Sequence, residues 1–63
     1  MKNNLKVLRA MHDMTQQQLS ERAGVSRQTI NSIETGRYIP STELALKLSV
    51  IFGKTVNEIF QLD

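Results

Sequence analysis

The chain has 63 residues, of which 40% are hydrophobic and 22% charged, and its formal net charge is +2. These proportions favour one small folded domain, residues 1–63, over a disordered segment or two separate cores. The absence of cysteine excludes disulfides, iron–sulfur clusters and thiolate zinc sites, so regular helix packing or a second subunit must stabilise so short a chain.

The first helix is predicted from hydrophobic spacing. Leu5, Leu8 and Met11 recur at the three-residue spacing that places side chains on one helical face, and Val7 lies beside them. We therefore expect a helix over about residues 4–12, with these apolar side chains in or near the core.

The second helix is predicted from a capping signal. Thr15 and Gln18 have the spacing of a capping box, in which each side chain bonds the backbone amide of the other residue. A helix is therefore expected over residues 16–23, and Gly24 ends it by taking the left-handed conformation that other residues adopt at a cost.

Three more helices follow by the same reasoning. Ser26 is the expected cap of a helix that ends before Gly36, and its buried face is marked by Ile30 and Ile33. Ser41, after Pro40, caps a helix over residues 42–52. Thr55 and Glu58 form a second capping box that opens a short fifth helix. The sequence thus predicts an all-α fold of five helices.

The fourth helix is apolar on two sides. One broad face carries Leu44, Ala45, Leu48, Ile51 and Phe52, whereas Leu46 and Val50 point the other way. This second face must be buried either under the C-terminal segment of the same chain or against another subunit. We favour dimerisation through residues 54–63 and this face. The candidate contacts are Leu46, Val50, Ile59, Phe60 and Leu62.

Residues 15–36 are suited to two helices that cross at a tight turn. Leu19 and Ala23 would face the isoleucines of the third helix, and small Ser20 stands where the two backbones approach most closely. This segment, TQQQLSERAGVSRQTINSIETG, resembles the helix-turn-helix of the Cro/C1-type repressors, a prokaryotic family also called xenobiotic-response-element-like. The likeness extends over nearly the whole chain.

The C-terminal residues 57–61 are similar to those of the short cytolysin-repressor-type members, which are small dimers without a ligand domain. That resemblance implies a short strand pair between the first residues and the C-terminal segment. The family resemblance also implies a salt bridge between Arg9 and Glu34 that ties the first helix to the end of the third. Two unrelated exposed charges are the alternative for this pair.

The exposed side of the third helix carries side chains that can read DNA. Arginine pairs with guanine and amide side chains with adenine in the major groove, which admits a helix. We therefore assign base reading to Arg27, Gln28, Asn31 and Ser32. The alternative is an ordinary solvated helix face, which the turn geometry disfavours.

Phosphate contacts are expected around the same helix. Gln16 stands at the N-terminus of the second helix, where the backbone amides carry partial positive charge. Thr29 and Arg37 are placed with these contacts. Tyr38 either joins them or packs under its loop. The basic excess of residues 1–37, six basic against three acidic side chains, agrees with this placement.

Other function classes fit less well. His12 and Asp13 are the only conceivable catalytic pair, but side chains adjacent in a helix diverge, and no metal, cofactor or small-molecule site accompanies them. An antitoxin of this fold would need an extension to wrap a toxin. Single-stranded or RNA binding would need more aromatic residues than the three present.

The sequence therefore predicts a homodimer that binds a near-palindromic operator in double-stranded DNA and acts as a transcriptional repressor. The two third helices would enter successive major grooves about 34 Å apart. We expect a cytoplasmic protein without membrane contact, because no segment has the roughly 20 apolar residues of a membrane helix.

Overall fold

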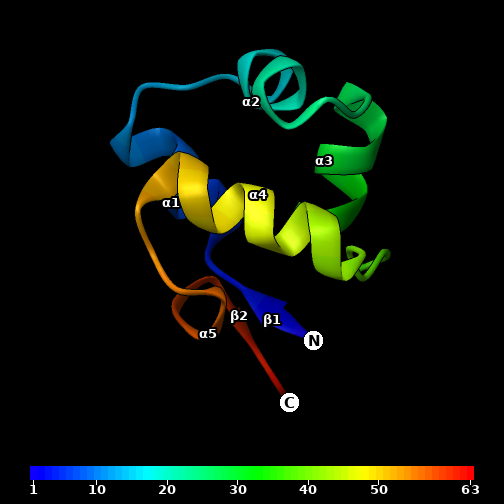
Figure 1. The fold of residues 1–63 in the computed structure, drawn as a ribbon. Coiled ribbons are helices and arrows are strands. Elements are labelled where there is room, and N and C mark those ends of the chain that lie inside the picture. The colour runs from blue at the N-terminus through cyan, green and yellow to red at the C-terminus, as the bar shows by residue number, and fades with distance from the viewer.

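The computed structural model describes residues 1–63 and contains five helices and one short strand pair, which confirms the expected fold (Figure 1). In chain order the elements are β1 (Lys2–Asn3), α1 (Leu5–Met11), α2 (Gln16–Ala23), α3 (Arg27–Glu34), α4 (Thr42–Phe52), α5 (Val56–Ile59) and β2 (Phe60–Gln61). The strands are antiparallel and bring the two ends of the chain together. None of the helices has the length and apolar character needed to cross a lipid bilayer.

Both predicted capping boxes are confirmed. The Thr15 hydroxyl accepts a hydrogen bond from the Gln18 amide at 3.0 Å, and the Gln18 side chain accepts one from the Thr15 amide at 2.9 Å. Thr55 and Glu58 repeat this arrangement at α5. The pKa of Glu58 is lowered, and the largest cause is the hydrogen bond with the Thr55 backbone. The hydrogen bond with the Thr55 side chain is the second cause. Local sequence alone therefore determines where these helices begin.

One hydrophobic core is shared by all five helices. Its buried side chains are Leu5, Leu8, Met14, Leu19, Ala23, Ile30, Ile33, Leu44, Leu48, Phe52, Ile59 and Phe60. Ser20 is the one buried polar residue, and its hydroxyl donates to the Gln17 carbonyl at 2.7 Å. A small side chain at this position lets α2 and α3 pack closely, as the sequence predicts.

The first helix departs from the sequence-based expectation at Met11, which is 70% exposed, and Val7 is exposed as well. The reason is geometric, because each step of three residues turns about 60° short of a full helical turn. Met11 is therefore displaced by two such steps from Leu5. Met14, in the segment after the helix, fills the core instead.

Two of the expected dimer contacts lie mainly in the core of the single chain. Ile59 has no exposed surface, which rules it out as a contact, and Phe60 is 8% exposed, so a partner could touch only its edge. Asn3 pairs with Phe60, and the Asn4 amide donates to the Ile59 carbonyl at 2.9 Å, which folds the C-terminal segment back under α4. Three of the five candidates keep exposed apolar surface, namely Leu46, Val50 and Leu62.

At the turn between α2 and α3, the energetic cost of a left-handed backbone can be measured separately from any side-chain clash. Gly24 has a φ of +72°, and apart from its own backbone and its two chain neighbours no atom lies within 4 Å of the position that a Cβ would occupy. Gly24→Ala should therefore destabilise the fold by about 1 kcal/mol through left-handed strain alone, and Gly24→Asn by less. Urea denaturation measures both values. An alanine variant as stable as the wild type would contradict this explanation of the turn.

Candidate nucleic-acid interface

Helix α3 lies at an edge of the molecule, with its outer side uncovered (Figure 1). It begins at Arg27 because the Ser26 hydroxyl accepts from the Thr29 amide at 3.1 Å. Ile30 and Ile33 point into the core, which leaves the opposite side of the helix to solvent. Three of the four residues assigned to base reading are exposed there, namely Arg27, Gln28 and Asn31.

Ser32, the fourth assigned residue, is only partly exposed. Its backbone carbonyl accepts from the amides of Arg37 at 2.9 Å and Tyr38 at 3.2 Å, so the following loop folds back against α3. A shallow hollow of about 240 Å³ lies between the helix and this loop. Its lining residues are Ser26, Gln28, Thr29, Ser32 and Tyr38. Two residues assigned to base reading, Gln28 and Ser32, and two assigned to phosphate contacts, Thr29 and Tyr38, thus share one surface.

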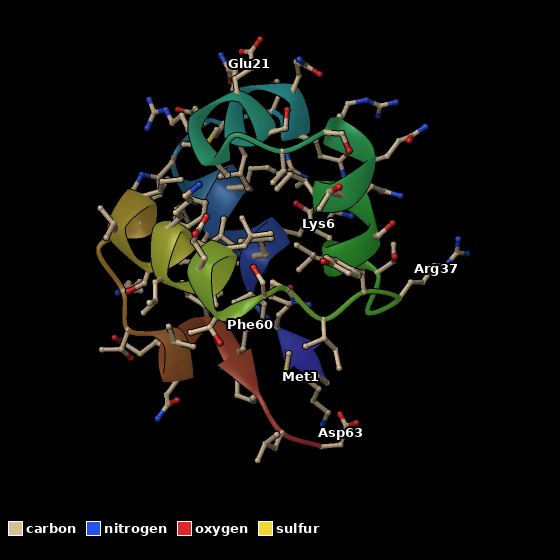
Figure 2. All side chains as sticks on the ribbon, turned by 45° about the vertical axis from the view of Figure 1, so that its right-hand side comes forward. Met1, Lys6, Glu21, Arg37, Phe60 and Asp63 are labelled. Atoms are coloured by element: carbon tan, nitrogen blue, oxygen red, sulfur yellow. The ribbon has the colours of Figure 1, made fainter.

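The charges on this surface are basic. Arg27 opens α3, and Arg37 projects from the loop after it, away from the body of the chain (Figure 2). Glu34 is the only acidic residue of α3, and its side chain is 4% exposed and paired with Arg9. No carboxylate of α3 therefore opposes an approaching polyanion, which favours contact with phosphate groups.

The Arg9–Glu34 pair is bidentate. The Arg9 Nε donates to Glu34 Oε2 at 2.8 Å and Nη2 donates to Oε1 at 3.2 Å, while Nη1 donates to the Met14 carbonyl at 2.9 Å. The hydrogen bond with Glu34, more than the coulombic attraction, raises the pKa of Arg9. The side chain of Arg9 is 16% exposed, so the pair is largely shielded from water. One guanidinium thus joins three parts of the chain, namely α1, the segment that precedes α2, and α3 itself.

The side chain of Gln16, which is expected from the sequence to contact a phosphate, bonds two side chains of α3. Its Nε2 donates to Asn31 Oδ1 and to Glu34 Oε1, both at 3.1 Å, so both N–H groups are used within the chain. The side chain offers no further N–H to a phosphate. The backbone amides of Gln16 and Gln17 in the first turn of α2 have no partner in the chain and remain available. The sequence did not reveal the two side-chain hydrogen bonds of Gln16, because their acceptors lie 15 and 18 residues away.

Residues 5–59 match the helix-turn-helix family. The chain is 52% identical over 60 residues to an HTH-type transcriptional regulator from Methanocaldococcus jannaschii, a match that covers 95% of the chain and 91% of that protein. It is 44% identical over 63 residues to the HTH-type transcriptional regulator YgzD from Bacillus subtilis, with 96% of that protein covered. A regulator of the same description from Archaeoglobus fulgidus is 41% identical over 63 residues, with 89% of it covered.

The ion pair can be tested by removing its charge. Arg9→Met leaves the Glu34 carboxylate nearly buried without its guanidinium, so we expect a loss of about 3 kcal/mol in the free energy of unfolding. Lys6→Met is the matched control, because Lys6 is exposed on the same helix and forms no salt bridge. Urea denaturation of both variants measures the difference, and equal stabilities would show that the pair contributes nothing.

The pH dependence of this contribution follows from the sign of the shift. Because the pKa of Arg9 is raised above its ordinary value, the stabilisation from the arginine side is fully present below the unfolded-state pKa. It is lost only as the pH rises through the higher folded-state pKa. Arginine stays fully charged up to about pH 12. The difference in the free energy of unfolding between Arg9→Met and wild type should therefore not change between pH 6 and pH 9 on account of Arg9.

Proposed function

Because the chain belongs to the helix-turn-helix family of transcriptional regulators, we propose that it binds double-stranded DNA through the outer side of α3 and represses transcription there. The observation that carries this proposal is the row formed by Arg27, Gln28 and Asn31. These long polar side chains stand exposed on an uncovered helix that bears no free carboxylate. A major groove admits such a helix with its polar side chains toward the base edges.

Arg27 and Gln28 are the principal base-reading residues of this proposal. Both lie in the first turn of α3, and N-terminal residues of a recognition helix reach deepest into the groove. The Arg27 guanidinium suits the O6 and N7 acceptors of guanine, and the Gln28 amide suits adenine. Ser32 is partly covered by the loop, so its contribution is the smallest of the assigned set.

Phosphate contacts would flank this helix on two sides. The unpartnered amides of Gln16 and Gln17 supply donors at the positive end of α2, and the Arg37 side chain supplies a full charge from the loop. Thr29 and Tyr38 border the hollow between α3 and that loop, where their hydroxyls can bond the same strand. These contacts fix the position of α3 without carrying sequence information.

A homodimer is the proposed binding unit. An apolar hollow of about 220 Å³ lies beside α4, and exposed Leu46 is at its edge. The other lining residues are Met1, Pro40, Thr42, Ala45, Val56 and Phe60. Two copies related by a two-fold axis would each cover the hollow of the other and present two α3 helices to one side of the duplex. A near-palindromic operator with half-sites about 34 Å apart matches that symmetry.

Repression is the proposed outcome of this binding. A small domain that binds DNA can regulate transcription most simply by occupying the operator. A dimer bound across two major grooves excludes other proteins from the same DNA. Dimerisation then makes operator occupancy depend on the concentration of the protein itself.

Two arginines distinguish base reading from phosphate binding. Arg27→Ala should cost about 1–3 kcal/mol on duplexes selected by the wild-type protein from a randomised pool, and it should relax the preference at one base position. Arg37→Ala should weaken binding to all duplexes alike and reduce the salt dependence by about one counterion. Fluorescence anisotropy at several salt concentrations measures both effects.

Lys54→Ala is the control for these arginines, because it removes one exposed positive charge from the loop between α4 and α5. It should change neither the base preference nor the affinity by a comparable amount. If Arg27→Ala reduced the affinity equally for every sequence, Arg27 would be a phosphate contact and the assignment of the reading row would fail.

The dimer can be tested at Leu46, which is 55% exposed at the edge of the hollow. The wild type should sediment as a dimer at micromolar concentration, and Leu46→Asp should sediment as a monomer because it places a charge in an apolar contact. Val7→Asp, on an exposed position of α1 that does not line the hollow, should remain a dimer. A wild type that is monomeric at every concentration would contradict the proposal.

A further inference from the structure

The turn that follows α3, residues 33–37, determines where the charge of Arg37 lies. The Arg37 side chain is exposed, takes part in none of the three salt bridges of the chain, and projects away from the body (Figure 2). Its position therefore depends on the backbone that carries it. The Arg37 amide donates to the Ser32 carbonyl at 2.9 Å, and the Gly36 amide donates to the Ile33 carbonyl at 3.0 Å. These two carbonyls thus set where the turn lies.

One of the two carbonyls is also held from outside α3. The Asn3 Nδ2 donates to the Ile33 carbonyl at 2.9 Å. Asn3 is the only residue of another element that bonds the backbone of the turn. The Met1 carbonyl oxygen lies 3.9 Å from the position that a Cβ at Gly36 would occupy, so the start of the chain lies directly beside the turn.

We propose that Asn3 is a positioning residue for DNA binding, which holds the Ile33 carbonyl so that Arg37 stands where it can contact a phosphate. The inference rests on the proposed function. The principal base-reading residues lie in the first turn of α3, at the opposite end of the helix from this contact. Loss of the Asn3 contact should therefore reduce the affinity for every DNA sequence alike and leave the base preference unchanged.

Asn3→Ser removes the contact with α3 selectively. The serine hydroxyl can still accept from the Leu5 amide, as the Asn3 Oδ1 does at 3.0 Å, because serine and asparagine form the same kind of local turn. Its side chain ends one atom earlier than that of asparagine, so it no longer reaches the Ile33 carbonyl. The replacement leaves the net charge unchanged, and any change in affinity is therefore not an effect of added charge.

Asn4→Ser is the matched control. It makes the same replacement one residue later and removes the hydrogen bond from Asn4 Nδ2 to the Glu58 carbonyl at 3.0 Å. That bond joins the two ends of the chain without touching α3. The control therefore separates a general loosening of the chain ends from the loss of the contact with α3.

The first experiment measures affinity by fluorescence anisotropy on a duplex that the wild type selects from a randomised pool. Asn3→Ser should weaken binding by about fivefold, the effect of one hydrogen bond, and should lower the salt dependence toward that of Arg37→Ala. Asn4→Ser should weaken binding by less than about twofold. Urea denaturation identifies conditions in which both variants are folded. Equal losses in the two serine variants would overturn the inference.

The second experiment tests whether Asn3 acts through Arg37. In the Arg37→Ala background, Asn3→Ser should change the affinity by less than about twofold, because the contact that Asn3 positions is already absent. A loss of about fivefold in both backgrounds would show that Asn3 acts independently of Arg37, and the positioning role would fail.

A third measurement needs no DNA and separates failure of this inference from failure of the proposed function. Amide hydrogen exchange by NMR should be faster at Gly36 and Arg37 in Asn3→Ser than in the wild type, and unchanged there in Asn4→Ser. Unchanged exchange in Asn3→Ser would overturn the inference while leaving DNA binding intact. If the wild type bound no duplex from the pool, the proposed function would fail, and the role of Asn3 in DNA binding would fail with it.

Discussion

The ion pair between Arg9 and Glu34 is the constraint on which the orientation of α3 depends. Glu34 stands in the last turn of that helix, and its carboxylate is nearly buried, so it requires a partner that remains charged. Arg9 meets this requirement from α1 and also binds the Met14 carbonyl ahead of α2. One side chain therefore links three segments, and together with the burial of Ile30 and Ile33 it keeps the polar side of α3 facing outward.

Helix α3 depends on these contacts because it has only eight residues, and isolated helices of such length are marginal in water. Its structure is supported from inside by Ile30 and Ile33 and at its start by the Ser26 cap. The two isoleucines act on the side turned away from solvent, and the cap acts at the exposed start of the helix. The exposed side chains of α3 therefore do not hold the helix in place. Asn31 is the exception, because its Oδ1 accepts a hydrogen bond from Gln16. The proposed base contacts can therefore vary with little effect on stability.

Features encoded within one turn of chain were predictable from residue spacing. Features that depend on distant partners were not, except for the Arg9–Glu34 pair and the terminal strand pair, which the family resemblance implied. Both capping boxes and all five helices follow from spacing and glycine positions, because each involves residues three or four apart. The burial of Ile59 depends on β1, more than fifty residues earlier, which no local pattern contains. The hydrogen bonds of Gln16 were missed for the same reason, since they arise only when α2 and α3 cross. Helical periodicity correctly predicted that Arg27, Gln28 and Asn31 are exposed. It did not predict that Ser32 is only partly exposed, because the loop that covers it is not part of the helix.

Asn3 joins the chain ends to both of the helices that the ion pair connects. Its Oδ1 accepts from the Leu5 amide at 3.0 Å, and its Nδ2 donates to the Ile33 carbonyl at 2.9 Å. The strand pair that holds Asn3 in place therefore also stabilises the C-terminal end of α3. Opening the strand pair would leave the Leu5 amide without its partner and would remove one of the donors to the Ile33 carbonyl, which also accepts from the Gly36 amide. Fraying at the termini is therefore coupled energetically to the C-terminal end of α3.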